Sequence, residues 1–163
     1  MLGVTNECIQ IDSRQHNLDA ILKLVSAAQY QIAIISRHLD SQIFNNEEVM
    51  HSAFMLARRA KFSNIRILVH DPIPMIKNGH RLLELSQRIS SKVEIRKICQ
   101  SHSHFNQSFL VADNIAYIHN IKSDLYDAEV NFSDKEKSKN LMETFKNIWG
   151  QSSQDTTLRR LCV

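Results

Sequence analysis

Residues 107–132 read QSFLVADNIAYIHNIKSDLYDAEVNF, and this stretch decides the fold. Apolar and β-branched residues predict two neighbouring strands, and a third short strand is expected near its end. Asp113 and Asn114 stand between the first two strands. Both residue types tolerate left-handed backbone angles and bond their own backbone, so they predict a tight turn. The stretch therefore predicts a hairpin, a polar loop and a third strand, and it is the first place to look for a site.

The chain upstream of this hairpin alternates between helical and strand patterns. Asp12 or Ser13 is expected to cap the first helix, and Asn45 or Asn46 the second. In chain order, the predicted elements are an edge strand at 4–11, a helix at 13–29, a strand at 31–36, a helix beginning near 46, a strand at 64–70, a loop or irregular turn at 71–78, a helix at 80–89, a strand at 92–98 and a polar loop at 99–106.

A last helix follows the hairpin. Ser133 and Glu136 have the spacing of a capping box, and Gly150 stands where a C-cap belongs. Helices and strands in this order predict an α/β fold, with a mixed β-sheet flanked by helices. We expect residues 1–150 to form one domain and residues 151–163 a polar C-terminal tail.

Composition gives a broad class. The chain has 163 residues, 43% hydrophobic and 23% charged, with a formal net charge of +3, which is ordinary for a globular domain. Three widely spaced cysteines without a CxxC pair are typical of reduced thiols in a cytosolic protein. The sequence shows no signal-peptide pattern and no apolar run of the ~20 residues that a membrane span needs. We expect a cytoplasmic protein without cofactor or metal.

Polar side chains follow two of the predicted strands. Arg37, His38 and Asp71 stand at strand ends, where α/β sheets tend to bind ligands. Arg37 and Asp71 could instead form a structural ion pair. His80 and Arg81 open a predicted helix after a glycine, and a helix N-terminus can hold an anion. These five residues are the candidate binding site for a phosphate-containing ligand.

The order of elements resembles one half of a phospholipase D-like domain. That superfamily is marked by His-x-Lys-x-x-x-x-Asp, and residues 109–113 (FLVAD), 116–118 and 128–132 are similar to its pattern. The phrases ILVHD at 67–71, GHRLL at 79–83 and ISSKVEIR at 89–96 are similar to a bacterial group of phospholipase D-like proteins without an assigned reaction. With Asp113 as the motif aspartate, Asn106 stands at the place of the histidine and Ser108 at that of the lysine.

These departures imply a degenerate site. An amide cannot attack phosphorus as a histidine does, and a serine hydroxyl carries no charge to stabilise phosphoryl oxygens. The leading hypothesis is a catalytically degenerate domain that acts as a binding or assembly module, paired as a homodimer across the edge where active halves of the superfamily meet.

Two alternatives remain open. In the first, a phosphodiesterase or nuclease uses His102, His104 or His119 in place of the missing histidine, with the rings close to one another or to Asp113. A His-x-His pair on an extended segment would place both rings on one face. In the second, nucleic acid binds basic residues that must share one face: Arg58, Arg59, Lys61, Arg81, Arg88, Arg96 and Lys97.

Overall fold

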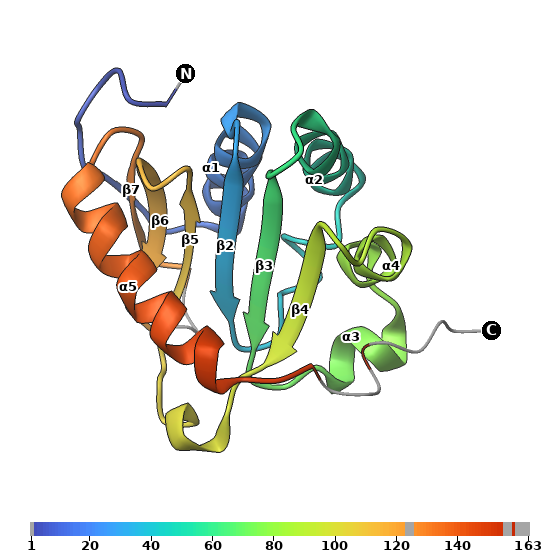
Figure 1. Ribbon diagram of the computed structural model, residues 1–163. Coiled ribbons are helices and arrows are strands. Elements are labelled where there is room, and N and C mark those ends of the chain that lie inside the picture. The colour runs from blue at the N-terminus through green and yellow to red at the C-terminus, as the bar shows by residue number, and fades with distance from the viewer. Residues whose placement is uncertain (1, 123–125, 155–157, 159–163) are drawn as a thin grey trace.

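The computed structural model describes residues 2–122, 126–154 and 158. A seven-stranded sheet runs through the molecule in the order β1-β7-β6-β5-β2-β3-β4 (Figure 1). Strands β2, β3 and β4 are parallel, whereas β2–β5, β5–β6, β6–β7 and β7–β1 pair antiparallel. The strands are β1 Ile9–Ile11, β2 Gln31–Ser36, β3 Asn64–Val69, β4 Val93–Lys97, β5 Ser108–Ala112, β6 Ala116–Asn120 and β7 Ala128–Asn131.

Helices cover both faces of this sheet, and the mixed α/β prediction is confirmed. The helices are α1 Arg14–Ala27, α2 Glu47–Arg59, α3 Ile73–Asn78, α4 Arg81–Arg88 and α5 Lys135–Gln151, with a 3-10 turn η1 at Gln100–His102. In Figure 1, α5 crosses the near face, and α1, α2 and α4 lie behind the sheet. Alternating strand residues separate two cores, because successive side chains point to opposite faces. Ile34 and Ile67 belong to the α1–α2–α4 side, and Ile35 and Leu68 to the α5 side.

Most boundaries agree with the sequence patterns, and the caps explain why. Ser13 caps α1 by accepting the His16 N–H, and Asn46 caps α2 by accepting the N–H groups of Glu48 and Val49. Residues 4–8 do not join β1, which is shorter than predicted.

Two local predictions were wrong. Residues 73–78 form the short helix α3, because Pro72 and Pro74 fall at its cap and first turn, where a missing N–H costs nothing, and Asp71 accepts the Ile73 N–H. Ser133 does not cap α5. Asp134 takes that position and accepts the Lys137 N–H, so no capping box forms.

The chain beyond α5 returns to the sheet. The helix continues through Gln151, past Gly150, and the N–H of Lys97 donates to the Ser153 carbonyl at 3.2 Å. Leu158 is buried in the core on the α1–α2–α4 side. At least part of the predicted tail therefore packs against the domain.

Candidate functional site

The carboxyl ends of β2 and β3 meet at one edge of the sheet. The N–H of Asp71 donates to the Arg37 carbonyl at 2.9 Å, which continues the pairing of the two strands beyond their ends. This pairing brings Arg37, His38 and Asp71 together, and His38 Nδ1 lies 3.9 Å from Asp71 Oδ2. The alternative Arg37–Asp71 ion pair is not what the structure contains, since Arg37 donates instead to Asn106 Oδ1 at 3.3 Å.

A crevice of about 430 Å³ lies beside these residues. Arg37 and His38 line it together with Asp40 and Gly79. The side chains of Arg37 and His38 are exposed to solvent. The crevice can therefore offer a guanidinium and an imidazole to an anion, with the Asp40 carboxylate as an opposing charge.

His70 lies at the same edge and was missed by the sequence reasoning. Burial, and then the charge of Arg37, lower the pKa of His70 below its ordinary value. Its Nε2 is buried and has no hydrogen-bond partner among the described residues. Its place as the residue directly after a β-branched strand, one before Asp71, was the available signal.

His80 and Arg81 have structural partners. His80 caps α4: its Nδ1 accepts the Leu82 N–H at 3.2 Å, and its Nε2 lies 3.1 Å from the Leu39 carbonyl. Only 2% of His80 is exposed, and burial lowers its pKa to about 4. The Arg81 guanidinium bonds Asn45 and does not line the crevice. Of the five predicted residues, Arg37, His38 and Asp71 come together, His80 forms a wall of the crevice, and Arg81 lies outside it.

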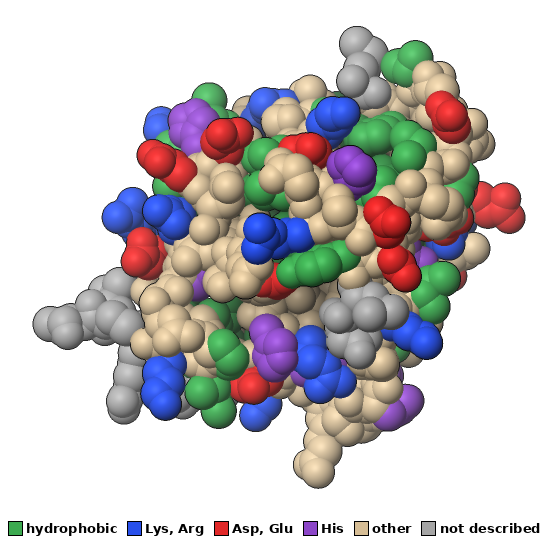
Figure 2. Space-filling view, turned by 180° about the vertical axis from the view of Figure 1, so that it is seen from behind, with side chains coloured by type: hydrophobic (Ala, Val, Ile, Leu, Met, Phe, Trp, Pro, Cys, Tyr) green, Lys and Arg blue, Asp and Glu red, His purple; other side chains and the backbone are tan. Residues whose placement is uncertain are grey.

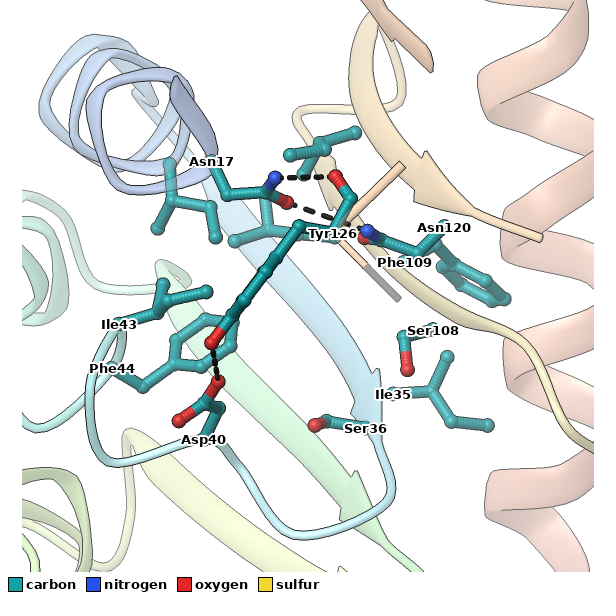
Figure 3. A pocket seen from close by; sticks show the side chains of 13 residues that line it. Asn17, Ile35, Ser36, Asp40, Ile43, Phe44, Ser108, Phe109, Asn120 and Tyr126 are labelled. Carbon is teal, nitrogen blue, oxygen red and sulfur yellow. Dashed lines mark hydrogen bonds between the residues drawn. The ribbon is translucent and has the colours of Figure 1, made fainter. Parts of the chain in front are cut away.

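Ser108, at the place of the motif lysine, faces a second and smaller cavity of about 60 Å³ (Figure 3). Asn17 and Asn120 lie on one side of it, with Asn120 Nδ2 3.4 Å from Asn17 Oδ1. Tyr126 closes another side by donating from its hydroxyl to Asp40 Oδ2 at 3.3 Å. None of the residues that line this cavity is Lys, Arg or His, and its one charged side chain is the Asp40 carboxylate. The Asp40 carboxylate would repel an anion in this cavity.

Asp113 lies at the far end of β5 from Asn106. Its carboxylate accepts the backbone N–H groups of Gln29, Tyr30 and Gln31 at 2.7, 2.8 and 2.9 Å. With Asn114 it forms the predicted turn, at φ values of 54° and 58°. Asp113 therefore joins the hairpin to the start of β2, and the structure does not place it beside any of the candidate histidines.

His119 points to the opposite face of the sheet from Ser108. Its Nε2 lies 2.8 Å from Gln107 Oε1, and its ring packs edge-on against Phe109. Burial, and then the charge of Lys137, lower its pKa. Nδ1 is buried without a hydrogen-bond partner in the described ranges.

His102 and His104 lie in and just after the turn η1, not on an extended strand, so the expected common face of a His-x-His pair does not arise. His102 Nδ1 lies 3.1 Å from Cys99 Sγ. Burial raises the pKa of Cys99, but hydrogen bonds from Ser101, His102 and Ser152 outweigh it and lower the pKa to about 7. The sequence reasoning missed this thiol–imidazole pair, whose only signal was the i, i+3 spacing.

Two of the three candidate histidines therefore have separate partners: Cys99 for His102 and Gln107 for His119. Among the described residues, no group of three or more His, Cys, Asp or Glu is placed to hold a metal ion. No helix in the same part of the chain is long and apolar enough to cross a membrane.

The seven basic residues proposed for nucleic acid do not share one face. Arg96 lies on the α5 side with its guanidinium 4.1 Å from the Trp149 ring centroid, whereas Arg81 is held by Asn45 at the start of α4. Arg59 donates to the Ala28 carbonyl at the opposite edge of the sheet. Figure 2 shows positive and negative side chains interspersed over the helical face. These seven residues therefore do not form one binding surface, and nucleic-acid binding stays a prediction.

Residues 13–161 match the family model described as Domain of unknown function (DUF7931). A search of curated proteins found no match to the chain.

Solved structures share the fold. The chain is similar to the archaeal chromatin protein TrmBL2, whose structure is described as showing a novel mode of DNA binding (TM-score 0.68, 15% identity). This match covers 93% of the chain and 54% of TrmBL2, so the chain spans about half the length of that protein. The phospholipase D family member Nuc from Salmonella typhimurium matches over 93% of the chain and 99% of its own (TM-score 0.64, 12% identity). NucT from Helicobacter pylori matches over 93% and 100% (TM-score 0.60, 10% identity).

The fold is accordingly that of a phospholipase D-like half-domain, as the resemblance implied. At these identities the likeness concerns the fold alone. A bacterial origin and a cytoplasmic location stay predictions.

Proposed function

Since the chain belongs to the DUF7931 family and has a phospholipase D-like fold, we propose that it is a non-catalytic phospholipase D-like domain that binds a phosphate-containing ligand. The ligand site is the crevice at the carboxyl ends of β2 and β3. The domain acts as a binding or assembly module.

The lining of the small cavity beside Ser108 supports the proposed loss of catalysis. The small cavity beside Ser108 has neutral polar side chains and the Asp40 carboxylate, but no cation and no nucleophilic ring among its lining residues. Transfer of a phosphoryl group needs a nucleophile and positive charge at the reacting oxygens. Asn106 supplies neither, since it is an amide bonded to Arg37. A cavity of about 60 Å³ is also far smaller than the 300–1,000 Å³ typical of ligand pockets, so it supports no substrate.

Arg37 supports the binding role. Its guanidinium is exposed at the rim of the larger crevice and can form charge-assisted, two-pronged hydrogen bonds to phosphate oxygens. His38 adds an imidazole, whose Nδ1 lies 3.9 Å from Asp71 Oδ2. The fold also occurs in TrmBL2, a protein described as a chromatin protein that binds DNA, which is a phosphodiester polymer.

The same edge supports self-association. Ile73 and Ile121 are 63% and 65% exposed, and they follow β3 and β6, which end at the same edge of the sheet as β2. Exposed apolar residues at one edge favour burial against a second copy. As an assembly module, the domain would form a homodimer across this edge. Light scattering after size exclusion should give twice the monomer mass, and Ile73→Asp with Ile121→Asp should return it to the monomer.

Two measurements test the proposed function. The protein should not hydrolyse bis(p-nitrophenyl) phosphate above the buffer rate, because the cavity lacks a nucleophile and a cation. Hydrolysis that disappears in His102→Ala, His104→Ala or His119→Ala would instead establish the enzyme alternative.

Binding is measured by calorimetry with inorganic phosphate and with dimethyl phosphate. Arg37→Ala should weaken binding about tenfold, which corresponds to about 1.4 kcal/mol for one lost charge-assisted contact. Lys146→Ala, which removes one exposed positive charge on α5, is the control and should bind like the wild type. Equal weakening by both variants, or no effect of Arg37→Ala, contradicts a site at the strand ends.

A further inference from the structure

The opposite edge of the sheet carries a different surface. The segments that enter β2, β3 and β4 meet there with the tip of the β5–β6 hairpin, at the top of Figure 1. Backbone contacts join them: the Asn64 N–H donates to the Tyr30 carbonyl at 3.0 Å, and the Ile65 N–H to the Lys92 carbonyl at 2.8 Å. Residues 28–31, 60–64, 88–92 and 113–114 therefore form one continuous surface, which we call the amino-edge surface.

Two aromatic rings protrude from the amino-edge surface. Phe62 is 83% exposed and Tyr30 is 67% exposed. Both flank Asn64, whose N–H donates to the Tyr30 carbonyl and whose side-chain amide donates to the Phe62 carbonyl at 3.2 Å. Single exposed apolar residues are ordinary, but two large exposed rings on residues whose backbone carbonyls both accept from Asn64 give a patch that favours planar partners.

Cations surround these rings. The Lys61 ammonium lies 5.6 Å from the Phe62 ring centroid, and the Lys92 ammonium bonds the Ala60 carbonyl at 2.8 Å. Two further cations end α2, and one ends α4. The cations of this edge are Arg58, Arg59, Lys61, Arg88 and Lys92.

The negative charge on this surface is already satisfied. Within its residues, Asp113 is the one carboxylate, and its two oxygens accept three backbone N–H groups. The acidic residues of α2 and α4 lie in their first turns, at the other edge of the sheet. Within its residues the amino-edge surface therefore presents three positive charges, on Lys61, Arg88 and Lys92, and two exposed rings, with its one carboxylate turned to the backbone. Arg58 and Arg59 adjoin it at the end of α2.

We propose that the amino-edge surface binds single-stranded nucleic acid. Arg and Lys neutralise backbone phosphates, and protruding aromatic rings stack on unpaired bases. A duplex would leave the rings without partners, because its bases are already stacked. An anionic membrane fits less well, since the exposed apolar groups of this surface are two rings on short turns and not the apolar face of an amphipathic helix. This inference concerns residues outside the strand-end crevice and is independent of the function proposed above.

The test uses the full chain and a fluorescein-labelled dT20 oligonucleotide, followed by anisotropy at several salt concentrations. Tyr30→Ala with Phe62→Ala should weaken binding by 10- to 100-fold at constant salt slope, because stacking is lost while phosphate contacts remain. Lys61→Ala should weaken binding and lower the slope of log affinity against log salt by roughly 0.7, as one phosphate contact in a single strand predicts.

Lys146→Ala, an exposed lysine on α5, is the control for general charge and should leave both quantities unchanged. An equal effect of Lys146→Ala and Lys61→Ala would overturn the proposal. So would binding that is independent of salt, duplex binding as tight as single-strand binding, or affinity for vesicles of anionic lipid without affinity for dT20. Circular dichroism of each variant establishes that loss of binding is not loss of fold.

Discussion

At the scale of single residues, the buried ring of His80 has a clear structural role. His80 caps α4 with one ring nitrogen and contacts the Leu39 carbonyl with the other, so the neutral ring satisfies both neighbours. Protonation would place an N–H against the Leu82 N–H and a charge in the core. Burial accordingly lowers the pKa from 6.5 to about 4. This histidine joins the predicted site only as part of its wall.

A pH dependence follows from that pKa. Between pH 6.5 and 4 the unfolded chain binds a proton at His80 that the folded chain does not. The free energy of unfolding is therefore fully retained above pH 6.5 and falls by about 3 kcal/mol as the pH drops through this window. His80→Asn keeps an acceptor for the Leu82 N–H but does not titrate. Urea titrations at pH 7 and pH 4.5 should show a smaller loss for His80→Asn than for the wild type; equal losses would refute the assignment.

Cys99 is the second reactive residue at this scale. Its thiol lies 3.1 Å from His102 Nδ1, and its pKa is lowered to about 7, so about half of it is thiolate near neutral pH. Because the thiolate is the nucleophile, iodoacetamide should alkylate Cys99 with a midpoint near pH 7. His102→Ala should move that midpoint upward. Cys8 is the internal control, since its hydrogen bond to Glu129 raises its pKa. Peptide mapping that finds Cys8 modified faster at pH 7 contradicts the prediction.

Local patterns predicted the elements well, and their exact ends less well. Strand β2 and the hairpin strands β5 and β6 were predicted from apolar runs, because a buried strand must be apolar wherever both faces are covered. Two neighbouring polar residues can each be the N-cap of a helix, and tertiary contacts decide which of them caps it. At α5, Asp134 and not Ser133 caps the helix, and the Ser133 N–H, which a capping box would give to Glu136, donates to Asn131 Oδ1 at 3.0 Å.

The stability of α5 should depend on its cap Asp134 and not on the neighbouring Ser133. Asp134→Ala should lower the free energy of unfolding by about 1 kcal/mol, because the Lys137 N–H loses its acceptor and the helix dipole loses a favourable charge. Ser133→Ala should change it by less than about 0.5 kcal/mol. Chemical denaturation of both variants decides between the two caps; a larger effect at Ser133 would restore the capping box.

At the scale of the whole molecule, two surfaces lie at opposite edges of the sheet, and the chain contributes to them in turn. The carboxyl edge collects Arg37, His38, His70 and Asp71, and the amino-edge surface collects Tyr30, Phe62 and their surrounding cations. Both depend on the parallel order β2-β3-β4, which aligns strand ends from segments that lie far apart in the sequence. The antiparallel hairpin then places Asn106 at the carboxyl edge and Asp113 at the other.

The sequence by itself determined the α/β class, the resemblance to a phospholipase D-like half, and the absence of histidine and lysine at 106 and 108, because periodicity and residue identity are local properties. The tertiary structure decided which polar residues meet. Strand register sends Ser108 and His119 to opposite faces, since neighbouring positions alternate across a sheet, and it places Asp113 on the backbone of residues 29–31. The tertiary structure also places Tyr30 and Phe62 at the same edge of the sheet, although no sequence motif relates these two residues.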